Sequence, residues 1–334
     1  MSGPATEIPP FKSAHARYAH HTARILGYGF RSLDAADGYL FEVSDGARRA
    51  FFSAGSGSPY AFNRAHANAL GRDKAFAQSV LSDVGLATIP SQLFFTSPRR
   101  AELRAPGREP ADARAYARSA PYPMFCKPIN GAQGAFAEII RDVGQFDRYL
   151  DRLAPSHYAF VAQPVIEAPE YRVLVLEGRA LFSYRKNPPS VLGDGASSLV
   201  QLVLSAIAEK RPGEPAPVLA ETLSGRDGDG RSYYVDEIPP DGSRVVLDGA
   251  ANRALGGSAD PPRTDVPAAL AQFALACASA LRLELAAVDL FDRGEGGLCV
   301  IEVNCNPAIK TLDDHGRWDL IETIWRANFA AALK

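Results

Sequence analysis

The sequence predicts an α+β fold divided into two or three domains. At 334 residues the chain is longer than one small hydrophobic core accommodates. Paired apolar runs joined by short turns indicate antiparallel hairpins, most clearly residues 171–184 with Glu177 and Gly178 at the turn. Runs with helical spacing, such as residues 267–283, lie between the hairpins. No GxGxxG motif follows a predicted strand, so the pattern does not indicate a Rossmann fold.

Apolar periodicity and the residues that end each run predict the other elements. Gly85 ends one helix as a C-cap residue does. The Arg-rich stretch between residues 96 and 124 is interpreted as a loose connector, and residues 212–231 as a mobile Gly-rich loop. Helices are expected over 15–26, 63–84, 146–153, 197–209 and 317–333, and strands over 39–43, 49–52, 92–96, 124–127 and 159–163.

Composition excludes several classes of function. A formal net charge of -2 gives no bulk attraction for nucleic acid or for an anionic membrane. No apolar run has the length of a transmembrane helix, and residues 1–10 lack the basic start and apolar stretch of a signal peptide. The four cysteines show no framework spacing. We therefore expect a cytoplasmic protein without nucleic-acid or membrane partners.

Three oxygen-bearing side chains on two neighbouring apolar runs form the most informative motif. Asp289 lies in the run 285–291, and Glu302 and Asn304 lie in the run 298–304. Glu302 and Asn304 are two residues apart, so on a strand they share one face. If the runs pair as a hairpin, Asp289 lies beside them. Hard oxygen ligands of this kind suit Mg²⁺. An acidic strand end with ordinary surface hydrogen bonds fits the three residues equally well.

A second candidate site follows the strand that ends at Lys127. The next residues include Gly131, Gln133 and Gly134, and glycines let backbone N–H groups approach phosphate oxygens while the lysine supplies charge. The loop does not have the P-loop spacing GxxxxGK[ST], and a plain β-turn explains it equally well.

Residues 163–167 and Glu170 form a third candidate. An extended backbone here can hydrogen-bond an adenine edge, and the Glu170 carboxylate can accept from ribose hydroxyls. A simple connector with acidic side chains accounts for the same residues.

Arg185 and Lys186 add two cations next to a Pro-Pro kink. Together with Lys127 and Lys74 they would concentrate the positive charge that phosphoryl transfer requires. Only seven of the 36 basic residues are lysines, so each lysine is a mild indication of a site that needs a compact ammonium. Lys74 falls inside a predicted helix, where a lysine is more often solvated.

The order of these pieces resembles the ATP-grasp superfamily, and most closely its cyanophycin-synthetase and bacterial glutathione-ligase branch. The resemblance spans roughly residues 63–310, about three quarters of the chain. The stretches that carry it are 68–74, 127–134, 163–172, 185–195, 245–257 and 289–307.

This resemblance implies an ATP-grasp fold in which two α+β subdomains clamp ATP. It divides the chain into a small N-terminal domain (1–66), an ATP-grasp N-terminal lid subdomain (67–161) and a C-terminal subdomain with the Mg²⁺ site (162–334). It makes a homodimer plausible.

The resemblance also implies roles for individual residues. Lys74 and Lys127 would hold the α- and β-phosphates, and the loop with Gly131, Gln133 and Gly134 would close over the triphosphate. Gln163 and Ile166 would line the adenine end, with Glu170 on the ribose. Asp289, Glu302 and Asn304 would carry one or two Mg²⁺ ions, with Mn²⁺ as a substitute, and Arg185, Lys186 and Asn252 would neutralise charge during catalysis.

The implied activity is an ATP-dependent carboxylate–amine ligase that forms an amide through an acyl phosphate, on an amino acid or small peptide. Two alternatives stay open: a kinase or carboxylate–thiol ligase of the same superfamily, and an ATP-binding regulator without turnover. Intact metal ligands and both lysines disfavour the regulator. His315 and Lys310 are read as loop residues or as substrate contacts, and Cys305 as part of the pocket wall.

Overall fold

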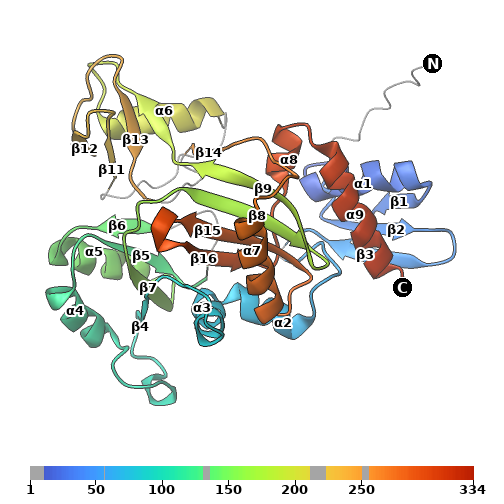
Figure 1. Cartoon of the computed structure of the whole chain (residues 1–334), viewed down its shortest axis with the longest axis horizontal. Helices are drawn as coiled ribbons and strands as arrows, with labels where there is room; N and C mark the ends of the chain where they lie inside the picture. Colours follow the sequence, from blue (N-terminus) through green and yellow to red (C-terminus); the bar gives the residue numbers. More distant parts are fainter. Residues whose placement is uncertain (1–10, 56, 131–135, 211–222, 250–255) are drawn as a thin grey trace.

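The computed structural model describes residues 11–55, 57–130, 136–210, 223–249 and 256–334 (Figure 1). Four antiparallel sheets with flanking helices make up this part of the chain, which confirms the α+β class. The sheet orders are β1-β2-β3, β4-β7-β5-β6, β14-β9-β8-β15-β16 and β10-β13-β11-β12.

The five-stranded sheet is the centre of the molecule. Its strands are β8 (Glu170–Leu176), β9 (Arg179–Asn187), β14 (Ser258–Ala259), β15 (Leu285–Asp292) and β16 (Leu298–Asn304), with the short 3₁₀ helix η3 (Gly294–Gly296) between the last two. One face is largely apolar and packs on helices α2 (Ala65–Arg72), α3 (Lys74–Asp83) and α7 (Ala268–Ala280).

The opposite face of this sheet changes character along the strands. Leu174, Phe182 and Leu285 belong to a core shared with the chain's last helices. Further along β8 and β15 the same face carries Arg172 and Asp289, because side chains alternate with a period of two residues. The sheet therefore supplies a core wall at one end and a polar surface at the other.

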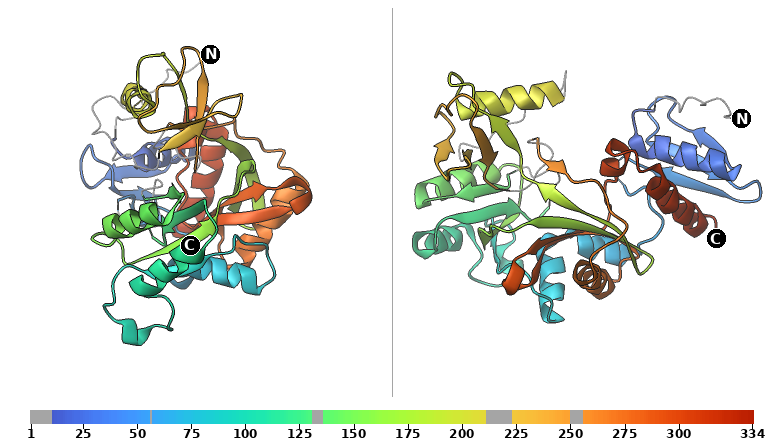
Figure 2. Two further views of the ribbon diagram at one scale, coloured as in Figure 1. Left: turned by 90° about the vertical axis from the view of Figure 1, so that its left-hand side faces the viewer. Right: turned by 45° about the horizontal axis from the view of Figure 1, so that its top comes forward.

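The N-terminal unit consists of α1 (Ala14–Leu26), β1 (Gly29–Ser32), β2 (Leu40–Ser44) and β3 (Arg49–Ser53). It packs on α8 (Lys310–Asp314) and α9 (Trp318–Ala332), as Figures 1 and 2 show. Trp325 of α9 is fully buried in this shared core. Because the unit takes part of its core from α9, the predicted 1–66 domain packs as one body with the chain's last helix.

The second sheet contains β4 (Gln92–Phe95), β5 (Met124–Pro128), β6 (Glu138–Ile140) and β7 (Ala159–Pro164). Its apolar face packs on α4 (Pro110–Ser119) and α5 (Val143–Leu153), and the short 3₁₀ helix η1 (Ala101–Leu103) precedes α4. The connector interpretation of the Arg-rich stretch is wrong for α4. Pro110 begins that helix, and the Asp112 carboxylate accepts from the Glu109 N–H, a capping arrangement.

The third sheet lies beside the second (Figure 1) and contains β10 (Ser190–Leu192), β11 (Ser224–Arg226), β12 (Ser232–Tyr234) and β13 (Arg244–Leu247), covered by α6 (Leu199–Lys210). Residues 224–226 were expected in a mobile loop, but they pair with both β12 and β13.

A single helix was predicted over residues 63–84, and the structure breaks it at Asp73. That residue has φ -90° and ψ 105°, and its carboxylate accepts from the N–H groups of Ala75 and Phe76. Asp73 thus acts as an N-cap, a role in which aspartate competes successfully with helix continuation. Lys74 consequently begins α3 instead of lying inside a longer helix.

Gly193→Ala is expected to destabilise the third sheet. A Cβ at Gly193 would lie 2.2 Å from the Pro240 carbonyl oxygen, a backbone atom that cannot swing away. We expect a loss of about 1–3 kcal/mol in the unfolding free energy of this sheet, the usual cost of overpacking. Amide hydrogen exchange of β10 and β13 measures it. Gly228→Ala, with nothing within 4 Å of the added Cβ, is the control; equal protection in both variants would contradict the prediction.

Candidate active site

A cavity of about 1020 Å³ lies where three sheets meet. These are the five-stranded central sheet, the sheet β4-β7-β5-β6 and the sheet β10-β13-β11-β12. Apolar side chains line it around the connector between β7 and β8, with Phe125 opposite Gln163 and Phe291 opposite Glu170 in the strand registers. Charged side chains from α3, β5, β8, β9, β15 and β16 also line it: Lys74, Lys127, Glu170, Arg172, Lys186, Asp289 and Glu302. The cavity thus combines an apolar region with a dense cluster of both charges.

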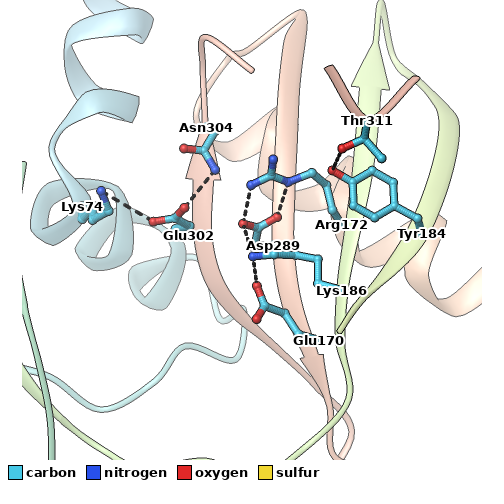
Figure 3. Close-up of polar contacts among 9 residues, drawn as sticks. All are labelled: Lys74, Glu170, Arg172, Tyr184, Lys186, Asp289, Glu302, Asn304 and Thr311. Carbon is cyan, nitrogen blue, oxygen red and sulfur yellow. Dashed lines mark hydrogen bonds and ion pairs between the residues drawn. The ribbon is translucent and has the colours of Figure 1, made fainter. Parts of the chain in front are cut away.

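The predicted hairpin forms and places Asp289, Glu302 and Asn304 on one face of the paired strands (Figure 3). Asp289 and Glu302 are cross-strand partners on β15 and β16, so their side chains share a face. The Asn304 Nδ2 donates to Glu302 Oε1 at 3.0 Å, which leaves the Asn304 amide oxygen available as a ligand.

This donor set fits a hard divalent cation such as Mg²⁺, because all three side chains offer oxygen. The described ranges hold no group of three or more His, Cys, Asp and Glu side chains arranged for a metal ion. An ion held by these two carboxylates therefore needs Asn304 and oxygens from a bound phosphate or water to complete its coordination.

Asp289 is held by two cations on the neighbouring strands. Arg172 donates from Nε and Nη2 to the two carboxylate oxygens at 2.6 and 2.7 Å, and Lys186 Nζ lies 3.4 Å from Oδ2. Lys186 also forms an ion pair with Glu170. Register places Arg172 opposite Asp289 and Glu170 opposite Lys186, so all four occupy one face.

The pKa shifts follow from this network. Burial raises the pKa of Asp289, but Arg172 and Lys186 outweigh burial and hold the pKa at about 2. Burial lowers the pKa of Lys186, yet Asp289 and Glu170 raise it to about 12. The pKa of Glu170 is raised, because burial exceeds the opposing effect of Lys186. At neutral pH Asp289 and Lys186 are therefore both charged.

Lys74 faces the second carboxylate of the hairpin. Its ammonium lies 3.6 Å from Glu302 Oε2, and both side chains are 23% exposed. Burial raises the pKa of Glu302, but Lys74 and Lys127 more than offset burial and keep that pKa below its usual value. The break at Asp73 creates this position, because it sets Lys74 in the first turn of α3.

Lys127 differs from the other cations of the cavity. The residue is 8% exposed, and no described carboxylate lies within ion-pair distance of its ammonium. The ring centroid of Phe125 lies 5.9 Å from Nζ. Burial lowers the pKa of Lys127, and the charge of Lys74 lowers it further, against Glu302, which raises it. A buried ammonium in this state is stabilised by an anion supplied from outside the chain.

The remaining predicted residues have different positions. Gln163 is buried and donates from Nε2 to Ser91 Oγ at 2.6 Å, and Ile166 lines the cavity. Arg185 borders the cavity, but strand alternation turns its side chain to the face opposite Lys186, beside Tyr171. Arg185 is therefore not grouped with the other cations. Gly131, Gln133, Gly134 and Asn252 lie outside the described residues.

Three residues of this region were not predicted as site residues: Arg172, Tyr184 and Thr311. Arg172 lies two residues after Glu170, so its place on the same face could have been predicted from strand alternation. Tyr184 lies opposite Arg172 on β9, and Thr311 belongs to α8.

Three other residues with open roles are near this region. Lys310 forms an ion pair with Asp314, and His315 Nε2 lies 3.2 Å from the Ala259 carbonyl oxygen. Cys305 is buried in the core, with its Sγ 3.5 Å from the Asn68 carbonyl oxygen.

Comparison with known proteins relates this chain to the ATP-grasp ligases. Residues 247–327 match the model of the RimK-like ATP-grasp domain, a stretch that includes the β15–β16 hairpin. These residues are similar to part of the RimK-like ATP-grasp domain, and the chain is a distant homologue of ATP-grasp ligases, as the sequence resemblance indicated.

Two curated relatives show how low the sequence identity to these ligases is. The glutathione biosynthesis bifunctional protein GshAB of Streptococcus agalactiae is 24% identical over 209 residues, which cover 55% of this chain and 27% of the relative. The cyanophycin synthetase of Synechocystis is 23% identical over 204 residues, which cover 57% of this chain and 23% of the relative. The matches thus span about a quarter of the length of these relatives.

Solved structures give weaker likenesses. A bifunctional glutathione synthetase from Pasteurella multocida has 17% identity and a TM-score of 0.48, with 93% of this chain and 44% of that chain covered. D-alanine–D-alanine ligase from Bacillus anthracis has 14% identity and a TM-score of 0.47, with 79% of this chain and 68% of that chain covered.

In this chain's described ranges, no helix is both long and apolar enough to cross a membrane.

Proposed function

We propose that this protein is an ATP- and Mg²⁺-dependent carboxylate–amine ligase that forms an amide bond through an acyl phosphate. The observation that carries the proposal is Lys127, a buried ammonium without an ion-pair partner among the described residues, in a cavity that also offers the Asp289–Glu302–Asn304 oxygens. An Mg²⁺–ATP complex supplies phosphate oxygens that pair with the Lys127 ammonium and a cation that the Asp289, Glu302 and Asn304 oxygens can bind.

The proposed chemistry has two steps. An oxygen of the substrate carboxylate bonds to the γ-phosphorus, the bond from that phosphorus to the β–γ bridging oxygen breaks, and ADP leaves with the electron pair. The amine nitrogen then bonds to the acyl carbon, inorganic phosphate leaves, and the surplus amine proton goes to solvent. Both steps need alignment and charge neutralisation, not an enzyme nucleophile.

The residues divide this work as follows. Lys74 and Lys127 bind phosphate oxygens, and Gln163 and Ile166 bound the adenine, with Glu170 at the ribose. Asp289, Glu302 and Asn304 hold Mg²⁺, which neutralises charge on the phosphates when bound. Lys186 and Arg172 neutralise charge at the transferring phosphoryl group, since both lie on the same face as Asp289. Gly131, Gln133, Gly134 and Asn252 keep the predicted roles in lid closure and catalysis.

We place the enzyme in the cytoplasm and propose an amino acid or small peptide as the carboxylate substrate, a small-molecule amine as its partner and a homodimer as its assembly. The lid and metal-site subdomains keep the proposed limits 67–161 and 162–334, although α2 and α3 pack on the central sheet. Mn²⁺ is expected to replace Mg²⁺.

The test replaces the unidentified amine by hydroxylamine. ATP, Mg²⁺ and hydroxylamine are incubated with the protein and a panel of amino acids and dipeptides, and hydroxamate and ADP are measured together. Equimolar hydroxamate and ADP establish acyl-phosphate chemistry. A stable phosphorylated product without hydroxamate indicates a kinase, and thioester formation with an added thiol indicates a carboxylate–thiol ligase. ATP binding without ADP release under all conditions would indicate the regulator and contradict the ligase.

Glu302→Gln is expected to lower the Mg²⁺-dependent rate of this reaction by about 100-fold, because it removes one ligand charge from the metal site. The amide has nearly the same shape, so the fold should be retained, with a lower thermal unfolding temperature because the ion pair with Lys74 is lost. Glu295→Gln, in the exposed turn of the same hairpin, is the matched control. A Glu302→Gln rate within about threefold of wild type would move the metal site elsewhere.

A further inference from the structure

Two hydroxyl groups line the cavity next to the Arg172–Asp289 pair. Tyr184 on β9 lies opposite Arg172 in the strand register, and Thr311 lies on α8 (Figure 3). Tyr184 is 6% exposed and its ring packs in the core with Phe182. Thr311 is 5% exposed. The two hydroxyls are therefore fixed by packing at the point where the core meets the cavity.

In the hydrogen bonds of this pair, the Tyr184 O–H is left without an acceptor among the described residues. Thr311 Oγ1 donates to the Tyr184 hydroxyl oxygen at 3.4 Å. A phenol has one proton to donate. Across the described residues, the Tyr184 hydroxyl has no further hydrogen-bond partner that could accept this proton. The Tyr184 O–H is thus a donor on an almost completely buried side chain that borders the cavity.

We propose that the Tyr184–Thr311 pair binds the substituent of the carboxylate substrate and selects substrates in which that substituent carries an oxygen acceptor, a carboxamide or a second carboxylate. This inference rests on the proposed ligase function. The reacting carboxylate must lie near the metal triad and Arg172. Tyr184 is the next residue across the sheet from Arg172, so it faces the atoms that adjoin the reacting group.

The energetic basis of the selection is the cost of an unpaired buried donor. When a substrate fills the cavity, the Tyr184 hydroxyl loses its hydrogen bond to water. A substrate with an oxygen acceptor forms a new hydrogen bond in its place. An aliphatic substrate of similar length leaves the phenol O–H without a partner. Sites that hydrogen-bond a substrate group discriminate strongly against analogues without it. We expect a preference of at least about fivefold.

The experiment measures binding, which does not depend on turnover. The full chain is saturated with Mg²⁺ and a non-hydrolysable ATP analogue, and L-glutamine, L-glutamate and L-norleucine are titrated by calorimetry. The same titrations are made with Tyr184→Phe and Thr311→Val, which remove single hydroxyls. Tyr171→Phe is the matched control, because Tyr171 lies on the opposite face of the adjoining strand and packs in a different core. In a separate assay with ATP, Mg²⁺ and hydroxylamine, hydroxamate formation is measured for each probe with each variant.

The expected result is tighter binding of glutamine or glutamate than of norleucine in wild type and in Tyr171→Phe. Tyr184→Phe should lose this preference without losing affinity for the nucleotide analogue, and Thr311→Val should lose part of it. The order of glutamine and glutamate identifies the acceptor as amide or carboxylate. A preference that survives in Tyr184→Phe overturns the proposal, as does equal binding, or no binding, of the three probes in wild type. A Tyr184-dependent preference without hydroxamate overturns the ligase reaction and leaves this subsite standing.

Discussion

Replacing Lys127 by methionine should weaken nucleotide binding strongly and leave the unliganded protein at least as stable as wild type. The ammonium is buried, and the described residues place no carboxylate within ion-pair distance of it. Burial of an unpaired charge lowers the unfolding free energy, and a buried methionine of similar length does not carry this cost. In the proposed ATP complex, however, the same charge would lie against phosphate oxygens. Loss of one partner from such a pair costs about 2–5 kcal/mol, which corresponds to at least about a 30-fold loss of affinity.

The dependence of this effect on pH has a definite sign. The folded state holds the pKa of Lys127 below 10.5, the ordinary value, so between these two pKa values the unfolded chain binds more protons than the folded chain. Stability of the wild-type protein therefore rises with pH through that range. The stability advantage of Lys127→Met should be largest below the folded-state pKa and should shrink as the pH approaches 10.5.

Denaturant unfolding at several pH values and calorimetric titration with an ATP analogue measure both effects. Lys12→Met is the control substitution, because Lys12 is exposed and paired with Asp37 at 2.6 Å. It should leave nucleotide affinity unchanged, and it should not remove the rise of stability with pH below 10.5 that Lys127 causes. Nucleotide affinity in Lys127→Met equal to that of wild type would show that the phosphate site lies elsewhere.

The sequence predicted the parts of the site that depend on local spacing. Glu302 and Asn304 share a face because two residues separate them on a strand, and the turn before Leu298 allows Asp289 to pair with Glu302. Lys127 was recognisable because it ends a strand before glycines. These features need only strand alternation and turn chemistry, which neighbouring residues determine.

Features set by contacts between distant residues were not predictable in the same way. Asp73 breaks a helical pattern that continues on both sides, and the Lys74 N–H bonds to the Ile129 carbonyl oxygen at 3.3 Å. Tertiary contacts of this kind override helix propensity. Arg185 and Lys186 were treated as equivalent cations, but only the pairing of β9 with β8 shows which of the two faces Asp289. Helix α4 escaped prediction because its buried positions are the alanines Ala113 and Ala117, whose small apolar side chains stand out little among its charged residues.

Arg172→Met is expected to have the opposite effect on stability from Lys127→Met, although both substitutions remove a cation from the same cavity. Asp289 is 1% exposed and both of its oxygens accept from Arg172. Loss of one partner of a buried ion pair typically costs about 3–5 kcal/mol, because the other charge stays buried. The ammonium of Lys186, at 3.4 Å, compensates only in part. We therefore expect a large loss of unfolding free energy together with loss of turnover.

The pH dependence and a double variant separate this mechanism from simple loss of packing. In wild type the folded-state pKa of Asp289 is about 2, below the ordinary value of 3.8, so its contribution to stability is present above pH 3.8 and is lost as the pH falls towards 2. The difference between wild type and Arg172→Met should accordingly be largest above pH 4 and decrease in acid. Adding Asp289→Asn to Arg172→Met removes the stranded carboxylate and should restore part of the lost stability without restoring activity. If the double variant is no more stable than Arg172→Met at neutral pH, the cost arises from packing, and Arg172 does not neutralise the metal-site aspartate.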